Sequence, residues 1–256
     1  MPLLREILAF MRQIAPEESA ISGDPVGLSI QFGLDIPVSK VGVCLDVTPE
    51  GASAAASADV QLVICHHPLI YSPLKKIDSS SDRVSQTIVP LITSRVALYA
   101  AHTNWDRAAG GINDTLAGML QLENTADLAP SGDASLARVG DLSLPVSLGD
   151  FRVAVARTLG CANENELRSR NDDPTRLIRR VAVCGGAGAG FMHEAVAAGA
   201  EAYVTSDVRH HEFLDAAALG LALLDAGHGA TERPGMQALR GRLTQEFPEV
   251  ETIWLG

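Results

Sequence analysis

The 256-residue chain lacks three features that would each point to a familiar class of protein. Its four cysteines include no C-x-x-C pair, which argues against a zinc site built from cysteines. It has no uncharged apolar run long enough to cross a membrane. Arg5, Glu6 and Arg12 interrupt the apolar pattern at the N-terminus, so that segment does not resemble a signal peptide. We therefore expect a soluble, reduced, cytoplasmic protein with no membrane partner.

Basic residues are also scarce. Twenty lysines and arginines stand against 31 aspartates and glutamates, which gives a net charge of −11. Because non-specific nucleic-acid binding rests on neutralising phosphates, this balance argues against a nucleic-acid partner. Aromatic residues make up only 4% of the chain, whereas hydrophobic residues make up 46%. The composition is typical of a globular protein with one large domain or two ordinary ones.

Buried strands and helices alternate along the chain. Apolar runs predict strands over 41–47, 62–65 and 96–101, separated by helices over 48–58 and 82–94. Strands over 181–184, 202–205 and 221–225 form a second series, in which helices over 191–198, 210–219 and 232–247 follow the strands. Strand–helix–strand units at this spacing indicate parallel sheets.

The composition shifts between residues 126 and 145, where Gly, Ser, Pro and Asp are frequent. We interpret this stretch as a domain boundary or a crossing segment. The first α/β domain then contains residues 1–125 together with about 229–256, and the second contains about 126–228. The predicted fold class is α/β, with two βα domains and mostly parallel or mixed sheets.

Metal-competent side chains follow three of the predicted strands. His66 and His67 follow the strand over 62–65, and Asp106 follows the strand over 96–101. His228 and Glu232 follow the strand over 221–225. Strand ends in α/β proteins point toward ligand sites, so these side chains are well placed to bind a ligand. Three imidazoles and two carboxylates are a set of donors that suits two divalent transition metals. Mixed nitrogen and oxygen ligands suit Zn, Mn, Fe, Co or Ni.

Each of these residues also has a plain structural interpretation. Asp106 is typical of a surface or capping position, and His228 between glycines is typical of a turn. With Thr231 as the helix N-cap, Glu232 would favour the helix dipole. It would also point back toward His228, where a carboxylate can bridge two ions. The joint occurrence of five such groups at three strand ends favours the metal site.

Further residues near the strand ends are candidates for substrate binding and proton transfer. The glycine-rich turn over 185–190 predicts either a phosphate-binding loop or a tight strand–helix turn. His102 is a candidate for proton transfer, for orienting Asp106 or for contacting substrate. We assign proton transfer to His102 and His211. The candidate substrate-binding residues are Gly186, Gly188, Asp207 and His210, although His210 and His211 are equally suited to capping a helix.

Five stretches, spread in order over almost the whole chain, resemble the GTP cyclohydrolase 1 type 2 homologue family, also called the NIF-three-like family. The matching stretches are Cys65-His66-His67-Pro68, His102 to Asp106 with Gly110 to Asp114, Val183 to Gly188, Thr205-Ser206-Asp207 with His210-His211, and Asp225 to Glu232. Asp24-Pro25-Val26-Gly27-Leu28 is similar to the family's Asp-Asn-Val-Gly-Leu, with Pro25 in place of Asn. Ser206 replaces a usual Gly, and Gly229 replaces a frequent aromatic residue.

The resemblance implies two α/β domains with a dinuclear metal centre in the interdomain cleft. His66, His67, Asp106, His228 and Glu232 fall on the family's metal ligands. It also implies a homo-oligomer, often a hexamer, and a small-molecule substrate, possibly a nucleotide. The implied activity is a metal-dependent hydrolase that opens the imidazole ring of GTP and releases formate. The alternatives are a di-metal phosphoesterase or other hydrolase, and a non-catalytic metal-binding or scaffold protein.

Overall fold

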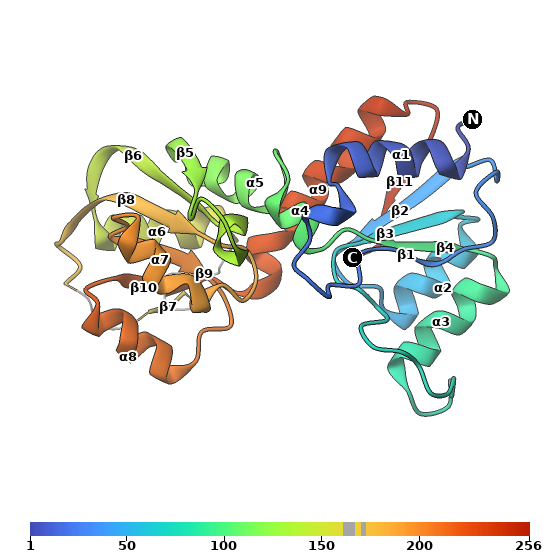
Figure 1. The fold of residues 1–256 in the computed structure, drawn as a ribbon, viewed down its shortest axis with the longest axis horizontal. Coiled ribbons are helices and arrows are strands. Elements are labelled where there is room, and N and C mark those ends of the chain that lie inside the picture. Colours follow the sequence, from blue (N-terminus) through green and yellow to red (C-terminus); the bar gives the residue numbers. More distant parts are fainter. Residues whose placement is uncertain (161–166, 170–172) are drawn as a thin grey trace. The chain divides into compact units, whose positions relative to one another are not determined.

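The fold was obtained as a computed structural model that describes residues 1–160, 167–169 and 173–256. The chain forms two compact units, one containing residues 1–109 with 236–256 and the other containing residues 110–235. Each unit has its own sheet and its own helices (Figure 1). This arrangement confirms the predicted mixed α/β class with two sheets.

The first unit is built on a five-stranded sheet. Its spatial order is β1 (Gly27–Ile30), β4 (Ala97–Ala100), β3 (Leu62–Cys65), β2 (Lys40–Cys44) and β11 (Glu251–Trp254). The last four strands are parallel, as the βα pattern predicts, and β1 pairs with β4 in the antiparallel direction. The helices of this unit are α1 (Leu4–Ile14), the 3-10 turn η1 (Glu17–Ser19), α2 (Pro49–Ser57), α3 (Arg83–Thr93) and α4 (Thr103–Arg107).

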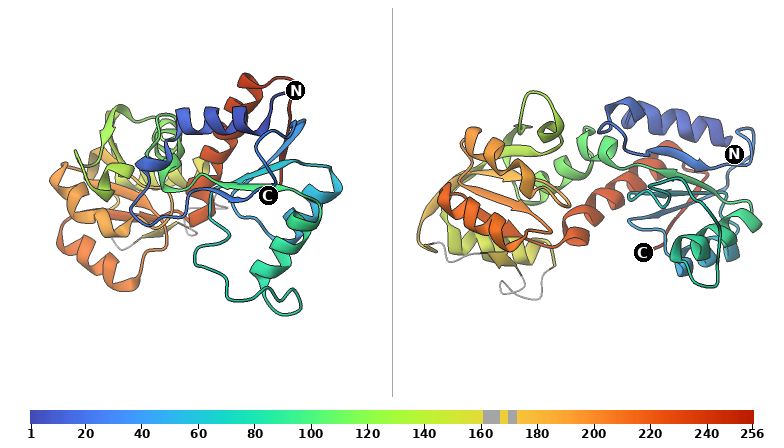
Figure 2. Two further views of the ribbon diagram at one scale, coloured as in Figure 1. Left: turned by 45° about the vertical axis from the view of Figure 1, so that its right-hand side comes forward. Right: turned by 60° about the horizontal axis from the view of Figure 1, so that its bottom comes forward.

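Helices cover both faces of this first sheet. α2 and α3 lie on one face, while α1 and the last part of α9 (His228–Glu246) lie on the other (Figures 1 and 2). Successive strand residues point to opposite faces, so Val63 and Cys65 join the buried cluster that also holds Ala52 of α2 and Leu91 of α3. Burial of both faces explains why these strands are continuous apolar runs in the sequence.

The second unit is built on a six-stranded mixed sheet among the described residues. Its order is β5 (Glu123–Asp127), β6 (Arg138–Ser147), β8 (Leu177–Val183), β9 (Ala202–Thr205), β10 (Ala222–Asp225) and β7 (Arg168–Ser169). β8, β9 and β10 are parallel, whereas β5, β6 and β7 join the sheet by antiparallel pairing. Its helical elements are α5 (Ile112–Met119), η2 (Asp133–Leu136), α6 (Leu148–Thr158), η3 (Ala189–Phe191), α7 (Met192–Ala197), α8 (His210–Ala218) and the first turns of α9.

Two apolar clusters lie on opposite faces of the second sheet. Val181 and Val183 belong to the cluster that contains Leu116 of α5 and Phe151 of α6. Ala182, which lies between those two valines, belongs to the cluster formed with α7 and α8. The period of two along β8 therefore distributes the helices over the two faces.

The stretch over 126–145 differs from its predicted role as a boundary or crossing segment. It contains the end of β5, η2 and most of β6, whose pairing with β8 makes it an internal strand of the second sheet. Its polar composition reflects exposure, because β5 is exposed along its length and β6 is buried mainly at its start. The two units divide the chain at 109/110 and 235/236, whereas the sequence placed boundaries near 125/126 and 228/229. The reason is α5, whose Leu116 and Ala117 pack in the second unit.

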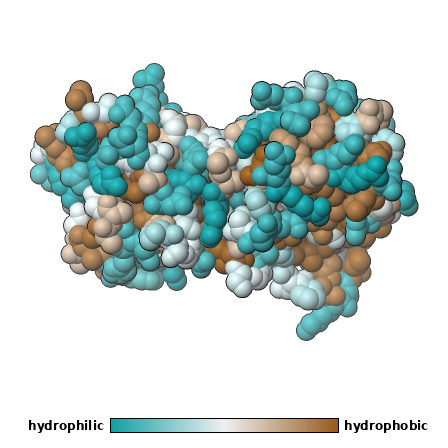
Figure 3. All heavy atoms as spheres, turned by 45° about the horizontal axis from the view of Figure 1, so that its top comes forward, coloured by the Kyte–Doolittle hydropathy of each residue, from teal (hydrophilic) through white to brown (hydrophobic). Residues whose placement is uncertain are grey.

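No helix of the described residues is long and apolar enough to span a membrane. On the face drawn in Figure 3, hydrophobic residues are interspersed with hydrophilic ones. Large exposed apolar side chains occur in both units, among them Tyr71 and Ile77 in the first and Leu144 and Leu177 in the second.

Candidate metal-binding clusters

The candidate residues of the first unit lie where three parallel strands end. β2, β3 and β4 end in register, so the segments that follow them emerge at one edge of the sheet. Asp46 follows β2, and His66 and His67 follow β3. His102 follows β4 and precedes α4. The sheet itself therefore brings these side chains together.

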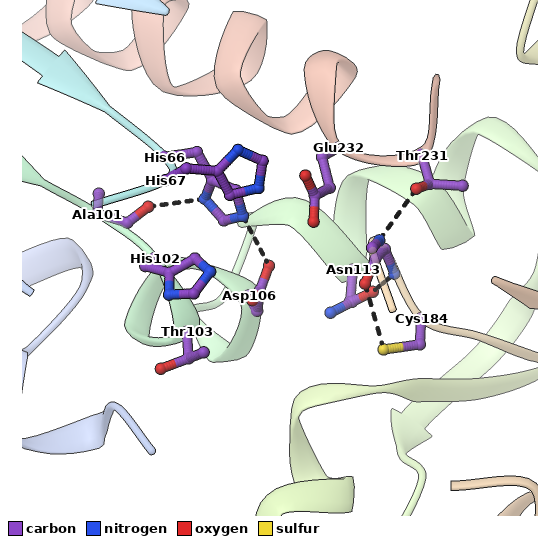
Figure 4. Close-up of polar contacts among 12 residues, drawn as sticks. His66, His67, Ala101, His102, Thr103, Asp106, Asn113, Cys184, Thr231 and Glu232 are labelled. Atoms are coloured by element: carbon purple, nitrogen blue, oxygen red, sulfur yellow. Dashed lines mark hydrogen bonds and ion pairs between the residues drawn. The ribbon is translucent and has the colours of Figure 1, made fainter. Parts of the chain in front are cut away.

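His66 is completely buried and is held by the backbone of the neighbouring strand. Its Nδ1 donates a hydrogen bond to the carbonyl oxygen of Ala101 at 2.8 Å. Its Nε2 lies 3.6 Å from Oδ1 of Asp106, which is also buried (Figure 4). Because Nδ1 is already bonded, Nε2 is the nitrogen that this ring presents toward Asp106.

His67 and His102 are oriented in the same way, but by carboxylates. His67 Nδ1 donates to Asp46 Oδ1 at 2.9 Å, and His102 Nδ1 donates to Asp24 Oδ1 at 2.8 Å. The centroid of the His66 ring lies 5.0 Å from that of His67 and 5.0 Å from that of His102. One ligand nitrogen from each of these three rings lies within 4.8 Å of the others, a spacing that can hold a metal ion.

Asp24 is the carboxylate that fixes His102. Burial by itself would raise the pKa of Asp24, but hydrogen bonds from His102 and Thr103 outweigh it and lower the pKa below its ordinary value. Both the backbone and the hydroxyl group of Thr103 donate to the Asp24 carboxylate. Asp24 therefore remains ionised and connects the 21–25 loop to the start of α4.

α4 places Asp106 within reach of the imidazoles. Asn104, two residues before Asp106, is completely buried and donates from Nδ2 to the carbonyl oxygen of Ala15 at 2.9 Å. That bond ties the helix to the end of α1. The short helix α4 explains how Asp106 turns toward His66. Asp106 lies four residues beyond His102, which is about one helical turn.

The second unit carries a histidine–carboxylate pair on α9. This helix begins at His228, so the prediction that Thr231 is its N-cap is wrong. His228 and Glu232 are one helical turn apart, and His228 Nε2 lies 3.1 Å from Glu232 Oε2. His228 Nδ1 donates to Asp207 Oδ2 at 2.5 Å. The bonds to Glu232 and then Asp207 raise the pKa of His228 from 6.5 to about 9 in the metal-free protein.

Three N–H groups of the glycine-rich turn donate to side chains of the protein, and Gly186 lies close to Glu232. The backbone N–H of Gly185 donates to Asn113 Oδ1 at 2.7 Å, and that of Gly186 donates to Thr231 Oγ1 at 3.0 Å (Figure 4). The N–H of Gly188 donates to Thr205 Oγ1 at 2.9 Å. Three backbone donors of the turn are thus bonded within the protein, as in the tight-turn alternative.

The remaining predicted residues fall into two groups. Asp207, a predicted substrate-binding residue, accepts a hydrogen bond from the predicted ligand His228. His210 and His211 lie exposed in the first turn of α8.

Sequence reasoning gave no role to several residues that hold the clusters in place. These are Asp24, Asp46, Asn113, Thr205 and, as a hydrogen-bonding group, Thr231. For Asp46 a signal was present, because it follows a strand adjacent to the His-His strand. Asp24 lies 78 residues before its partner His102, so local spacing alone does not reveal the pair.

The donor sets of both clusters fit divalent first-row metals. Imidazole nitrogens and carboxylate oxygens are suitable ligands for such ions, and each ring uses its other nitrogen for a hydrogen bond, as metal-binding histidines commonly do. Fold and clusters together define a class, namely α/β proteins with histidine–carboxylate groups at the ends of parallel strands. Within that class, the chain belongs to the Duf34/NIF3 (NGG1p interacting factor 3) family, whose model matches residues 2–255.

Individual relatives support this membership. A protein of a Nostoc species named GTP cyclohydrolase 1 type 2 homolog is 36% identical over 230 residues, which cover 90% of this chain and 85% of that protein. The crystal structure of a Bacillus cereus protein related to NIF3 has a TM-score of 0.90 at 25% identity and covers 99% and 96% of the two chains. Reduced HcgD from Methanocaldococcus jannaschii has a TM-score of 0.83 at 27% identity, with 99% and 98% covered. The predicted family resemblance is confirmed.

Proposed function

We propose that the chain is a metal-dependent hydrolase that holds two divalent ions through His66, His67, Asp106, His228 and Glu232. The observation that carries the proposal is the bonding of the imidazoles. In His66, His67 and His228, Nδ1 donates to an oxygen acceptor, so a metal ion would be bound through Nε2, which in His66 and His228 faces a predicted carboxylate ligand. This is the arrangement by which proteins fix the tautomer and direction of metal-binding histidines.

The chemistry that such ions supply when bound is the activation of water near neutral pH. The chain's own residues would hold substrate and move protons around that step. His102 is the candidate proton acceptor in the first unit, because Asp24 holds its Nδ1 and stabilises the positive charge that the ring gains with a proton. His211, which is exposed on α8, is the weaker of the two proton-transfer candidates.

The proposed substrate is a purine nucleotide, with GTP as the first to test. The support is the name carried by curated relatives, GTP cyclohydrolase 1 type 2 homolog. In the proposed reaction, water adds to C8 of the purine, the imidazole ring opens and further hydrolysis releases formate. The proposed substrate-binding residues are Gly186, Gly188, Asp207 and His210. The bonds of Gly186 to Thr231, of Gly188 to Thr205 and of Asp207 to His228 give the first three a positioning role as well.

The deciding experiment measures metal content and turnover in the same preparation. Purified protein loaded with Mn²⁺ or Zn²⁺ should contain two ions per chain and release formate from GTP. The His66→Ala and Glu232→Ala variants should lose metal, whereas His193→Ala, which changes an exposed histidine of α7, should retain it. Full metal occupancy in both ligand variants would overturn the site assignment.

The same measurement separates the alternative functions. Hydrolysis of another phosphoester without formate release would identify a di-metal phosphoesterase. Two tightly held ions without turnover on a broad substrate panel would identify a metal-binding or scaffold protein. We also propose a homo-oligomer, with a hexamer as the expected size, and sedimentation velocity of the purified protein would reveal a monomer if this is incorrect.

A further inference from the structure

We propose that Asp225 is a positioning residue that locks His228 in its metal-binding orientation. The proposal deepens the proposed function and rests on its metal-binding part. Asp225 is the last residue of β10 and is only 5% exposed. Nothing in its sequence position alone distinguishes it from an ordinary strand-end aspartate. What distinguishes it is the set of groups that its carboxylate contacts.

The two oxygens of Asp225 bond to two different loops. Oδ1 accepts from the backbone N–H of Gly227 at 3.1 Å, in the connection from β10 to α9. Oδ2 accepts from the backbone N–H of Val208 at 3.1 Å, in the connection from β9 to α8. One carboxylate thus holds together two segments that are not adjacent in the sequence.

These two backbone groups flank the residues that form the pair described above. Val208 directly follows Asp207, and Gly227 directly precedes His228. Asp207 and His228 are themselves joined by the 2.5 Å hydrogen bond from Nδ1 to Oδ2. Asp225, Val208, Asp207, His228 and Gly227 therefore form a closed ring of covalent links and hydrogen bonds.

This closed ring of bonds restrains Asp207, whose backbone conformation is unfavourable. Its φ of +56° lies in the left-handed region, which non-glycine residues rarely adopt unless their surroundings impose it. The bond from the Val208 N–H to Asp225 and the backbone bond from Ala226 N–H to Thr205 O at 2.8 Å supply that restraint. Loss of the Asp225 carboxylate would allow Asp207 to relax and His228 to rotate.

Arg168, which is largely exposed, also bonds to Asp225 and to Val208. Its guanidinium donates to Asp225 Oδ2 at 2.9 Å and to the carbonyl oxygen of Val208 at 3.0 Å. The arginine side chain is 57% exposed, whereas that of Asp225 is 6% exposed. The buried Asp225 carboxylate thus accepts hydrogen bonds from two backbone N–H groups and from one cation.

The test measures Co²⁺ binding to the full chain by calorimetry and by the visible absorption of the bound ion. Asp225→Asn should weaken Co²⁺ binding about 10-fold or more, the size of effect that orienting residues around metal ligands have. Asp215→Asn, on the exposed face of α8, is the matched control and should bind as the wild type does. Amide hydrogen exchange of the metal-free variant should be faster at Val208 and Gly227, a readout independent of any activity.

A double-variant cycle separates positioning from a general structural role. Because Asp225 is proposed to act through Asp207, Asp207→Asn combined with Asp225→Asn should bind Co²⁺ no more weakly than Asp207→Asn alone. Two independent structural effects would instead add. Additive losses would contradict the proposed route through Asp207.

Arg168→Met provides a second variant at an exposed position, in case Asp225→Asn does not fold. Removal of the cation should weaken Co²⁺ binding several-fold. Unchanged affinity in the folded variants overturns the role of Asp225 while the proposed function stands. A wild-type chain that binds no Co²⁺, Mn²⁺ or Zn²⁺ overturns the proposed function itself, so the two failures are distinguishable.

Discussion

His228 holds a proton more tightly than an ordinary imidazole, and the stability of the metal-free protein should reflect this. Its pKa rises from 6.5 to about 9 on folding, so its contribution to stability is fully present below pH 6.5 and is lost as the pH rises through about 9. We expect the melting temperature of chelator-treated wild type to approach that of His228→Gln between these values. Thermal unfolding followed from pH 6 to 9.5 measures this difference, and a gap that stays constant with pH would contradict the assigned contacts.

At the level of single residues, the sequence predicted the chemical groups better than their contacts. His66 and His67 were predicted from a strand that ends at a His-His pair, and the structure places both rings beside His102. Asp24 could not be derived from spacing, because its bond to His102 spans 78 residues and depends on how a loop packs against α4. The left-handed backbone of Asp207 and its bond to His228 could not be predicted, because they are properties of the folded chain.

The glycine turn between β8 and α7 gives a prediction at the level of an element. Gly186 has a φ of +65°, and a Cβ atom there would collide with the carboxylate of Glu232. Gly186→Ala should therefore destabilise the fold by roughly 1–3 kcal/mol and displace Glu232. Gly190→Ala in the same turn is the control, because it has no positive φ and a Cβ there meets nothing within 4 Å.

Chemical denaturation and metal binding of the two variants test this prediction together. Gly190→Ala should match the wild type in both measurements, whereas Gly186→Ala should lose stability and metal affinity. Equal behaviour of the two alanine variants would show that the close approach of the turn to Glu232 has no energetic consequence.

Elements buried on both faces were predictable, and elements on the surface were not. β3, β4, β9, β10 and the last three residues of β8 appear in the sequence as mainly apolar runs because helices cover both faces of each sheet. β6 was not predicted, because it is paired on both sides only in part and is half-buried or exposed beyond its first three residues. The start of α9 was placed four residues late because Gly227 and Gly229 around His228 are typical of a turn.

For the whole molecule, metal binding should increase the free energy of unfolding and the melting temperature. A ligand that binds only the folded state stabilises it by about 2.7 kcal/mol when its concentration is 100 times its Kd. Co²⁺ in excess should therefore raise the melting temperature of the wild type and have a smaller effect on His66→Ala. Mg²⁺ is the control ion, because it prefers all-oxygen coordination and should leave the melting temperature nearly unchanged. Equal shifts with both ions would indicate non-specific binding to an acidic chain.

The family and the α/β class follow from features that extend over the whole chain. The matched motifs are distributed from residue 24 to residue 232, and the family model covers residues 2–255. The choice of metal does not follow in the same way. Imidazole and carboxylate groups accept several first-row ions, and affinity within that series is governed by geometry and availability in addition to donor type.

Four imidazoles in this chain carry an acceptor of their own: the carbonyl of Ala101 for His66, Asp46 for His67, Asp24 for His102 and Asp207 for His228. These hydrogen bonds restrict the rotation of each ring in the folded protein, before any ligand binds. The entropy that a flexible imidazole would lose on coordination is thus already lost. A metal ion meeting these rings therefore gains bonding enthalpy with little conformational reorganisation. At His228 the ion must also displace the proton that the contacts with Glu232 and Asp207 help to hold, so capture at that ring should weaken as the pH falls below about 9.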